Sequence, residues 1–248
     1  MTYCLSMLLD TGLVFLSDSR TNAGVDHVST FRKATVFEKP GDRVLVLQTA
    51  GNLAATQSVV TLLTEEIAMG KDQPSLMNCK TLHEAACLVG SALRRIHDRD
   101  GEALQKFGFD FNPALILGGQ IAGEKPRLFN LYAAGNFIEA TPDTTYFQIG
   151  ESKYGKPIID RVIRRTSSLN EAVKCALVSM DSTIRSNLSV GLPLDLVIVK
   201  RDQLRVARHM SIDSSNDYFR QISSGWSEAL RQAFVQLPDH DWSQPRDA

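Results

Sequence analysis

The sequence lacks several features that would indicate a particular partner or compartment. Its 248 residues carry 27 Lys and Arg against 28 Asp and Glu, and this formal net charge of −1 gives no basic footprint for nucleic acid. No window approaches the run of about 18 apolar residues that a membrane-spanning helix needs. The residues before Arg20 include Asp10 and Asp18 but no Lys or Arg, which excludes the positively charged start of a signal peptide. We therefore expect a cytosolic (cytoplasmic) protein with no nucleic-acid and no membrane partner.

Motifs for metals, cofactors and common nucleophiles are also missing. The four cysteines lie too far apart for a zinc or CxxC motif. The five histidines form no HExxH pair, and no glycine-rich phosphate loop is present. The segment 150–154 misses the GxSxG nucleophile elbow because Tyr154 stands where the second glycine is needed. The sequence therefore predicts a protein that uses no metal and no cofactor.

Hydrophobic patterning predicts strands in hairpin runs rather than strands that alternate singly with helices. Strands are predicted over 3–9, 13–17, 34–38, 43–49, 114–121, 127–134, 145–149 and 194–199, with weaker candidates over 204–207 and 209–212. Helices are predicted over 53–70, from the capping box at 81–84, from about 157, from the capping box at 168–171, and over 217–237. This order is typical of antiparallel sheets covered by helix pairs.

No linker or internal repeat interrupts the pattern, so a single domain is predicted for residues 1–248. Its core spans about 1–200, a helical extension covers about 213–237, and a loop forms the tail 238–248. Residues 99–112 are predicted to be a polar loop. The rings of this loop are expected to fold onto the protein's own core, with a subunit contact as the alternative, and they belong to Phe107, Phe109 and Phe111.

Thr2 is the first residue whose chemistry suggests a function. Small second residues are the kind from which the initiator Met1 is normally removed, and its removal would leave Thr2 with a free α-amine. Such an amine has a pKa near ~7.7–8.0 and can act as a base at neutral pH, beside a hydroxyl that can act as a nucleophile. A threonine activated in this way is a recognised route to covalent acyl transfer. The hairpin that follows would hold this terminus in place.

Charged residues are expected to gather near Thr2. The second strand of the hairpin runs antiparallel to the first, so its end returns beside the terminus and brings Asp18 close to it. Arg32 and Lys33 lie just before the third strand and can supply a cation to pair with Asp18. The expected cluster combines a hydroxyl, a carboxylate and an ammonium group.

Together these residues resemble a known family. Thr2, the Asp-x-Arg-x-x-x-Gly run at 18–24, Lys33 and the segment 49–51 are similar to the proteasome β-subunit family, within the N-terminal-nucleophile hydrolases. The start Met-Thr-Tyr-Cys and the segments 17–24 and 149–157 resemble Anbu, a bacterial branch related to HslV. The resemblance spans about residues 1–200. It implies an α/β (α+β) fold, a four-layer αββα sandwich of two antiparallel sheets.

The resemblance also implies a role for each matching residue. Thr2 would attack the scissile carbonyl and form an ester acyl-enzyme. Lys33 would lower the pKa of the Thr2 hydroxyl and amine, and Asp18 would orient Lys33. The backbone N–H of Gly51 would stabilise the oxyanion. An apolar and rather shallow specificity pocket would be lined by Thr21, Thr49 and Leu53.

Two places depart from the family pattern. Where proteasome subunits carry a serine near the terminal amine, this chain has Glu151 or Ser152. We favour Ser152 for this position because it carries a hydroxyl. Late in the chain Ser189 matches the family's second serine, but Ser186 stands where the family has aspartate. The loss of that aspartate predicts a less well oriented amine, and hence a weak or selective hydrolase.

The function predicted from these residues is a threonine peptidase that hydrolyses peptides or unfolded proteins inside a homo-oligomer, either a ring or a spiral. Two alternatives stay open from the sequence. One is a hydrolase of the same fold that acts on a small amide, and the other is a structural subunit that kept the fold and lost the chemistry. Whether an unfoldase partner feeds the assembly is also open.

Overall fold

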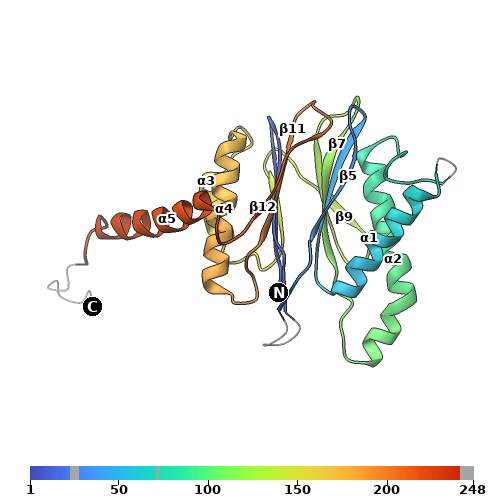
Figure 1. Cartoon of the computed structure of the whole chain (residues 1–248), viewed down its shortest axis with the longest axis horizontal. Coiled ribbons are helices and arrows are strands. Elements are labelled where there is room, and N and C mark those ends of the chain that lie inside the picture. Colours follow the sequence, from blue (N-terminus) through green and yellow to red (C-terminus); the bar gives the residue numbers. More distant parts are fainter. Residues whose placement is uncertain (23–27, 71–72, 241–248) are drawn as a thin grey trace, which may run out of the picture.

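The computed structural model describes residues 1–22, 28–70 and 73–240 and arranges them in four layers. Helices α1 (Leu53–Ala68) and α2 (Leu82–Lys106) form one outer layer, and α3 (Lys156–Val162) and α4 (Leu169–Ser186) form the other (Figure 1). Two antiparallel five-stranded sheets lie between these helix pairs. The predicted αββα sandwich is confirmed.

The sheet beside α3 and α4 contains the start of the chain. Its strand order is β10-β1-β2-β11-β12, and every neighbouring pair is antiparallel. The strands are β1 (Tyr3–Leu9), β2 (Gly12–Asp18), β10 (Tyr146–Gly150), β11 (Leu194–Lys200) and β12 (Val206–Ile212). Since β1 lies between β2 and β10, backbone hydrogen bonds hold the first residues of the chain from both sides.

The second sheet packs against α1 and α2. Its order is β5-β6-β7-β8-β9, again antiparallel throughout. The strands are β5 (Ala34–Lys39), β6 (Arg43–Ala50), β7 (Ala114–Ile121), β8 (Arg127–Leu131) and β9 (Phe137–Glu139). A short separate hairpin, β3 (Arg20–Asn22) and β4 (Val28–Thr30), links the two sheets in sequence.

Three apolar cores fill the spaces between the four layers. In β1 successive side chains point to opposite faces, so Cys4 and Leu8 lie between the sheets while Leu5 and Met7 face α3 and α4. Both faces of this strand are buried, which explains why it reads as a continuous apolar run rather than as an alternating one.

The ends of the helices follow the predicted capping residues. Ser168 and Glu171 form the capping box that starts α4, and Thr81 caps α2 by accepting the N–H of Glu84. The start of α1 is capped by Asn52, whose Oδ1 accepts the N–H of Ala55 at 3.1 Å. This cap fixes the junction between β6 and α1, where the pocket described below is located.

The prediction of a loop over 99–112 is wrong in its first half. Helix α2 continues to Lys106. Gly101 costs only about 1 kcal/mol in a helix, and the five residues that follow it, Glu-Ala-Leu-Gln-Lys, are all strong helix formers. The helix stops at Gly108, whose φ of 75° is the left-handed conformation that ends many helices.

The predicted packing of the three phenylalanines is also wrong for two of them. Phe111 packs against the α1–α2 core, as expected. Phe107 and Phe109 are instead 80% and 63% exposed. They lie on the cap that ends α2, and this cap directs them away from the core.

Other strand predictions need smaller corrections. The strand predicted over 127–134 ends early, as β8 at Leu131, because Gly135, with φ of 76°, closes a turn by donating its N–H to the Tyr132 carbonyl. The strand β9 that follows this turn was not predicted. The two weak candidates over 204–212 form one strand, β12, and the β3–β4 hairpin was not predicted. Ala23 and Gly24 of the predicted motif, and residues 241–248 of the predicted tail, lie outside the described residues.

Helix α5 (Asp217–Val235) forms as predicted and projects away from the helix layer of α3 and α4 (Figure 1). Its only buried residue is Phe219. Large apolar side chains along it are exposed, namely Tyr218, Leu230, Phe234 and Val235. None of the helices in the described ranges has the length and hydropathy to cross a membrane.

Candidate active site

A pocket of about 660 Å³ opens where the chain begins, at the end of the sandwich marked N in Figure 1. It is bounded by the start of β1, by β3, by the residue before β5 and by the junction of β6 with α1. Six of the nine residues predicted at the site line it, namely Thr2, Thr21, Lys33, Thr49, Gly51 and Leu53. The fold therefore gathers these residues from well separated parts of the sequence.

Thr2 is held in the pocket by the turn that follows β10. Its carbonyl accepts the N–H of Glu151 at 2.7 Å. Gly150 adopts a φ of 81°, and a Cβ at this position would lie 1.9 Å from the Thr2 carbonyl oxygen. Only glycine allows this close approach. Met1 precedes Thr2 and is 64% exposed, so it lies at the mouth of the pocket rather than in the core.

Tyr3 anchors the strand that carries Thr2. Its N–H donates to Asp18 Oδ1 at 3.0 Å, and its hydroxyl bonds to Ser179 Oγ at 2.7 Å. Gln148 Nε2 also donates to this hydroxyl, at 2.5 Å. Burial raises the pKa of Tyr3, so its hydroxyl stays protonated. The Tyr3 side chain therefore helps to fix β1, in addition to the backbone hydrogen bonds with β2 and β10.

We expect Tyr3→Phe to lower the free energy of unfolding by about 1–3 kcal/mol, because it removes the hydroxyl that bonds the buried Ser179 and the half-buried Gln148. Chemical denaturation followed by circular dichroism measures this change. The partly exposed Tyr132 provides a matched control, since Tyr132→Phe removes the same hydroxyl from the surface and should have almost no effect.

Lys33 and Asp18 form a buried ion pair beside Thr2. The two side chains are 5% and 0% exposed, and Lys33 Nζ lies 2.7 Å from Asp18 Oδ1. Lys33 Nζ also donates to the Arg20 carbonyl at 2.6 Å. Burial raises the pKa of the Asp18 carboxyl, while Lys33 and the N–H groups of Tyr3 and Gly191 oppose that shift. The pair fixes one positive charge at the floor of the pocket.

Gly51 also lines the pocket, in a backbone conformation that favours glycine. Its φ is 97°, and a Cβ there would lie 2.2 Å from the Asn112 carbonyl oxygen. The next residue, Asn52, donates its N–H to Asn112 Oδ1 at 3.1 Å and caps α1. Gly51 therefore sits just before the N-terminus of α1, where backbone N–H groups favour negative charge.

Cys4 is the other nucleophilic side chain near the pocket, and its environment disfavours reaction. It is fully buried, and its thiol donates to the Thr49 carbonyl at 3.7 Å. Burial raises the pKa of this thiol, so the reactive thiolate is scarce at neutral pH. Thr2, by contrast, is only partly buried and lines the pocket.

At the first departure from the family pattern, it is the backbone of Glu151, rather than that of Ser152, that bonds Thr2. Glu151 is 6% exposed, and its carboxylate accepts the Asn187 side-chain amide at 2.9 Å. Ser152 lines a different cavity, with Tyr146 and Asp160. Its proposed role near the amine therefore has no support from this geometry.

Ser189 belongs to the same hydrogen-bonded segment. Its N–H donates to Asn187 Oδ1 at 2.9 Å, and Asn187 in turn bonds Glu151. Ser189 thus connects to the neighbour of Thr2 through two hydrogen bonds, but it does not line the pocket around Thr2. Its catalytic role stays a prediction.

Sequence reasoning missed one wall of the pocket, which is formed by Gly108, Phe109, Asp110 and Asn112. These residues fall in the segment predicted to be a loop on the core. The signal available in the sequence was Gly108, a helix-ending residue flanked by two phenylalanines. Among residues 1–22, 28–70 and 73–240, no cluster of three His, Cys, Asp or Glu side chains could hold a metal ion.

Solved structures similar to this chain show its family. Anbu (ancestral beta-subunit) from Yersinia bercovieri is 54% identical, over 96% of this chain and 99% of that one, with a TM-score of 0.90. The chain belongs to the Anbu family. A Gly-1 mutant of Anbu from Hyphomicrobium sp. strain MC1 is 50% identical over 97% of this chain and 100% of that one, with a TM-score of 0.91. A structure described as the helical assembly of the Anbu complex from Pseudomonas aeruginosa is 48% identical over 98% and 100%, with a TM-score of 0.92.

A more distant relative connects this Anbu-family chain to proteasomes. The proteasome subunit beta of Haloquadratum walsbyi (strain DSM 16790 / HBSQ001) is 23% identical over 163 residues. The match covers 66% of this chain and 60% of that protein, less than two thirds of its length. No family model matches the chain. The predicted N-terminal-nucleophile hydrolase fold and the predicted Anbu resemblance are both confirmed by these likenesses.

Proposed function

We propose that this Anbu-family chain is a threonine peptidase whose nucleophile is Thr2, exposed as the N-terminal residue when Met1 is removed. The observation that carries the proposal is the position of Thr2 in one pocket with the buried Lys33–Asp18 pair and the N-terminus of α1. Hydroxyl, fixed cation and backbone donors are the groups that covalent acyl transfer needs.

The proposed reaction begins with proton transfer from the Thr2 hydroxyl to its own α-amine. The hydroxyl oxygen bonds to the substrate carbonyl carbon, and the carbonyl oxygen becomes an oxyanion that the Gly51 N–H stabilises. The charge of Lys33 lowers the pKa of both Thr2 groups, which keeps the amine unprotonated and ready to act as a base. Asp18 holds Lys33 in place through their 2.7 Å ion pair.

The tetrahedral intermediate then collapses. The carbon–nitrogen bond of the peptide breaks, and the departing amine takes the proton from the Thr2 ammonium group. This leaves an ester between Thr2 and the acyl half of the substrate. A water molecule, deprotonated by the same amine, hydrolyses the ester and restores Thr2.

The buried Glu151 carboxylate supports the orientation of the amine in this proposal. It follows Gly150 directly and is held by Asn187, within the segment whose N–H already bonds the Thr2 carbonyl. In this proposal it supplies the acidic group that the chain lacks at Ser186. In this proposal Glu151, rather than Ser152, is the residue that acts near the terminal amine.

We also propose that copies of the chain assemble into a homo-oligomer that encloses the pockets. The related Pseudomonas aeruginosa structure is described as a helical assembly, and α5 leaves exposed apolar side chains that association would cover. Sedimentation velocity of the full chain tests this, and a monomer at micromolar concentration would contradict it.

The catalytic proposal is tested by replacing Thr2. We expect Thr2→Ala to reduce hydrolysis of fluorogenic peptide amides by about 10³-fold or more, and Thr2→Ser to retain measurable turnover because its hydroxyl and amine are preserved. Unchanged hydrolysis by Thr2→Ala would refute the proposal. Parallel assays with small acyl amides address the second candidate, a small-amide hydrolase, which the sequence left open.

A further inference from the structure

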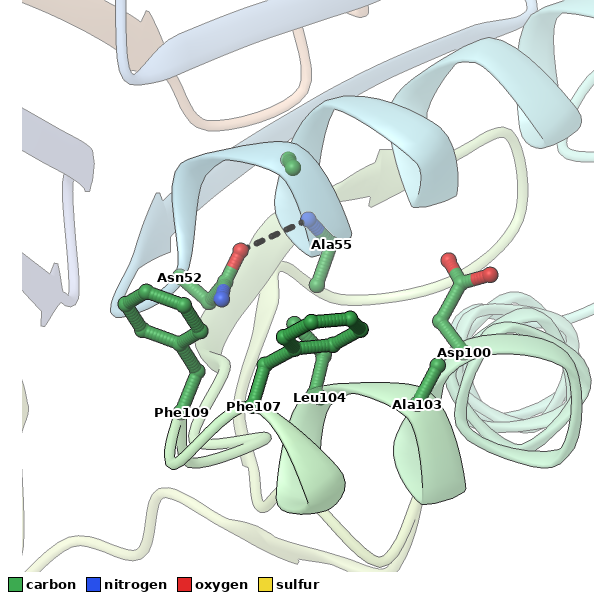
Figure 2. Close-up of a pocket in the computed structure, with 8 residues that line it drawn as sticks. Asn52, Ala55, Asp100, Ala103, Leu104, Phe107 and Phe109 are labelled. Atoms are coloured by element: carbon green, nitrogen blue, oxygen red, sulfur yellow. Dashed lines mark hydrogen bonds between the residues drawn. The ribbon is translucent and has the colours of Figure 1, made fainter.

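A second cavity adjoins the pocket at Thr2. It has a volume of about 340 Å³ and lies between the start of α1 and the end of α2 (Figure 2). Asn52 and Phe109 line both cavities, so the two share a wall. Since Asn52 directly follows Gly51, this second cavity begins one residue from the proposed oxyanion donor.

The second cavity is lined mainly by apolar side chains. Figure 2 shows the rings of Phe107 and Phe109 directed toward the first turn of α1, where Asn52 and Ala55 lie. The remaining lining residues are Ala54, Asp100, Ala103 and Leu104. Rings that are 80% and 63% exposed leave a large apolar area in water, and covering this area is favourable.

The polar groups at its edge are already engaged. Arg99 donates to both carboxylate oxygens of Asp100, at 2.7 and 2.6 Å, and holds the pKa of that carboxyl below its usual range. The Asn52 side-chain oxygen accepts the N–H of Ala55. The cavity thus suits a neutral apolar group better than a charged one.

The backbone segment that carries the two rings is held in place by hydrogen bonds. Gly108 ends α2 in a left-handed conformation, and the N–H of Phe109 donates to the Leu104 carbonyl at 2.9 Å, as in the Schellman ending. At the other end of the segment, Asn112 accepts the N–H of Asn52 at 3.1 Å. The segment is therefore tied both to α2 and to the start of α1, and the cavity exists without a ligand.

We infer that this cavity is a second substrate subsite, which takes one large aromatic or branched aliphatic side chain of the polypeptide bound at Thr2. The inference rests on the proposed function. An extended chain advances about 3.3 Å per residue, so a cavity that starts one residue from Gly51 is reached by a side chain within about three residues of the scissile bond. The substrate class is then an unfolded chain or peptide with an apolar residue at that fixed offset.

A second copy of the chain is the other candidate occupant. The shared wall argues against it, because a copy packed on Phe109 would also cover the entrance to the Thr2 pocket. A substrate bound at Thr2, by contrast, already lies beside Asn52 and Phe109, which line both cavities.

The test measures peptide binding to the full chain carrying Thr2→Ala, so that no acyl-enzyme forms. Fluorescence anisotropy compares labelled heptapeptides that carry Phe or Ala at each position around the centre. At one position, Phe should bind about 10- to 100-fold more tightly than Ala. Adding Phe107→Ser, which removes one wall, or Ala103→Phe, which fills the cavity, should abolish that preference.

A matched control comes from the far end of α1. Met69 is 65% exposed and lies about 24 Å from the start of this helix, so Met69→Ser should leave the preference unchanged. A preference that persists in both cavity variants, or the absence of any preference, overturns the inference. A smaller particle in sedimentation of Phe107→Ser with unchanged binding assigns the rings to an interface and overturns it too.

The subsite and the proposed chemistry fail in different ways. A β-lactone probe that carries no apolar side chain reports on Thr2 alone, because it has no group that could occupy the subsite. If the probe labels Thr2 while peptides show no positional preference, only the subsite is refuted. If peptides show the preference but the probe never labels, the proposed nucleophile is refuted.

Discussion

Replacing Lys33 with methionine is expected to abolish hydrolysis and to destabilise the protein. Without the cation, the Thr2 amine and hydroxyl lose the charge that lowers their pKa, so peptide turnover should fall by about 10²–10⁴-fold. The buried Asp18 carboxylate is left unpaired, which should cost about 3–5 kcal/mol of unfolding free energy. Initial rates and urea denaturation measure the two effects.

The loss of stability in Lys33→Met should depend on pH in a defined direction. Burial without the cation raises the pKa of Asp18 above its value in the unfolded chain, so the folded state holds the proton over a wider range. Stability should then decrease as pH rises through that raised pKa and recover at lower pH. The wild-type protein, with the ion pair intact, should show a weaker dependence.

The double variant Asp18→Asn/Lys33→Met separates folding from catalysis. Asparagine keeps an oxygen for the N–H of Tyr3 and carries no charge, so most of the lost stability should return. Hydrolysis should stay absent because the cation is still missing. Recovery of turnover along with stability would show that Lys33 acts only through the fold.

Replacing Gly51 with alanine is the second change with a large expected effect. Its φ of 97° disfavours any L side chain, and the new Cβ would meet the Asn112 carbonyl oxygen. The backbone at the start of α1 must shift, which moves the N–H proposed to bind the oxyanion. We expect a loss of about 10²–10³-fold in kcat, measured on a peptide amide.

Gly41→Ala controls for backbone strain alone. Gly41 has a comparable φ of 81°, but nothing lies within 4 Å of the position its Cβ would take. This variant should lose some stability, about 1 kcal/mol, and keep full turnover. If both alanine variants lost activity to the same extent, strain rather than the position of the Gly51 N–H would explain the result.

The cluster at Thr2 could be predicted because local rules determine it. A short turn at 10–12 pairs Cys4 with Ser17, and this register sets Asp18 opposite Tyr3. Lys33 precedes β5 at the same end of the sandwich and reaches Asp18. Hairpin register and strand order are therefore enough to bring the hydroxyl, the carboxylate and the ammonium together.

The rest of the site depends on backbone conformations that spacing does not reveal. Gly150 adopts a left-handed φ that turns the chain so that Glu151, rather than Ser152, bonds Thr2. The exposure of Phe107 and Phe109 follows from the cap at Gly108, because the helix continued past the point where its sequence became polar. In each case the conformation of one glycine, Gly150 or Gly108, decides where the following side chains lie.

The most direct test of the account is the intact mass of the purified full chain before and after reaction with a β-lactone. We predict a mature chain without Met1 that gains a single adduct, mapped to Thr2 by fragmentation and absent from Thr2→Ala. A chain that retains Met1, or an adduct on any other residue, would contradict the proposal that Thr2 acts as an N-terminal nucleophile.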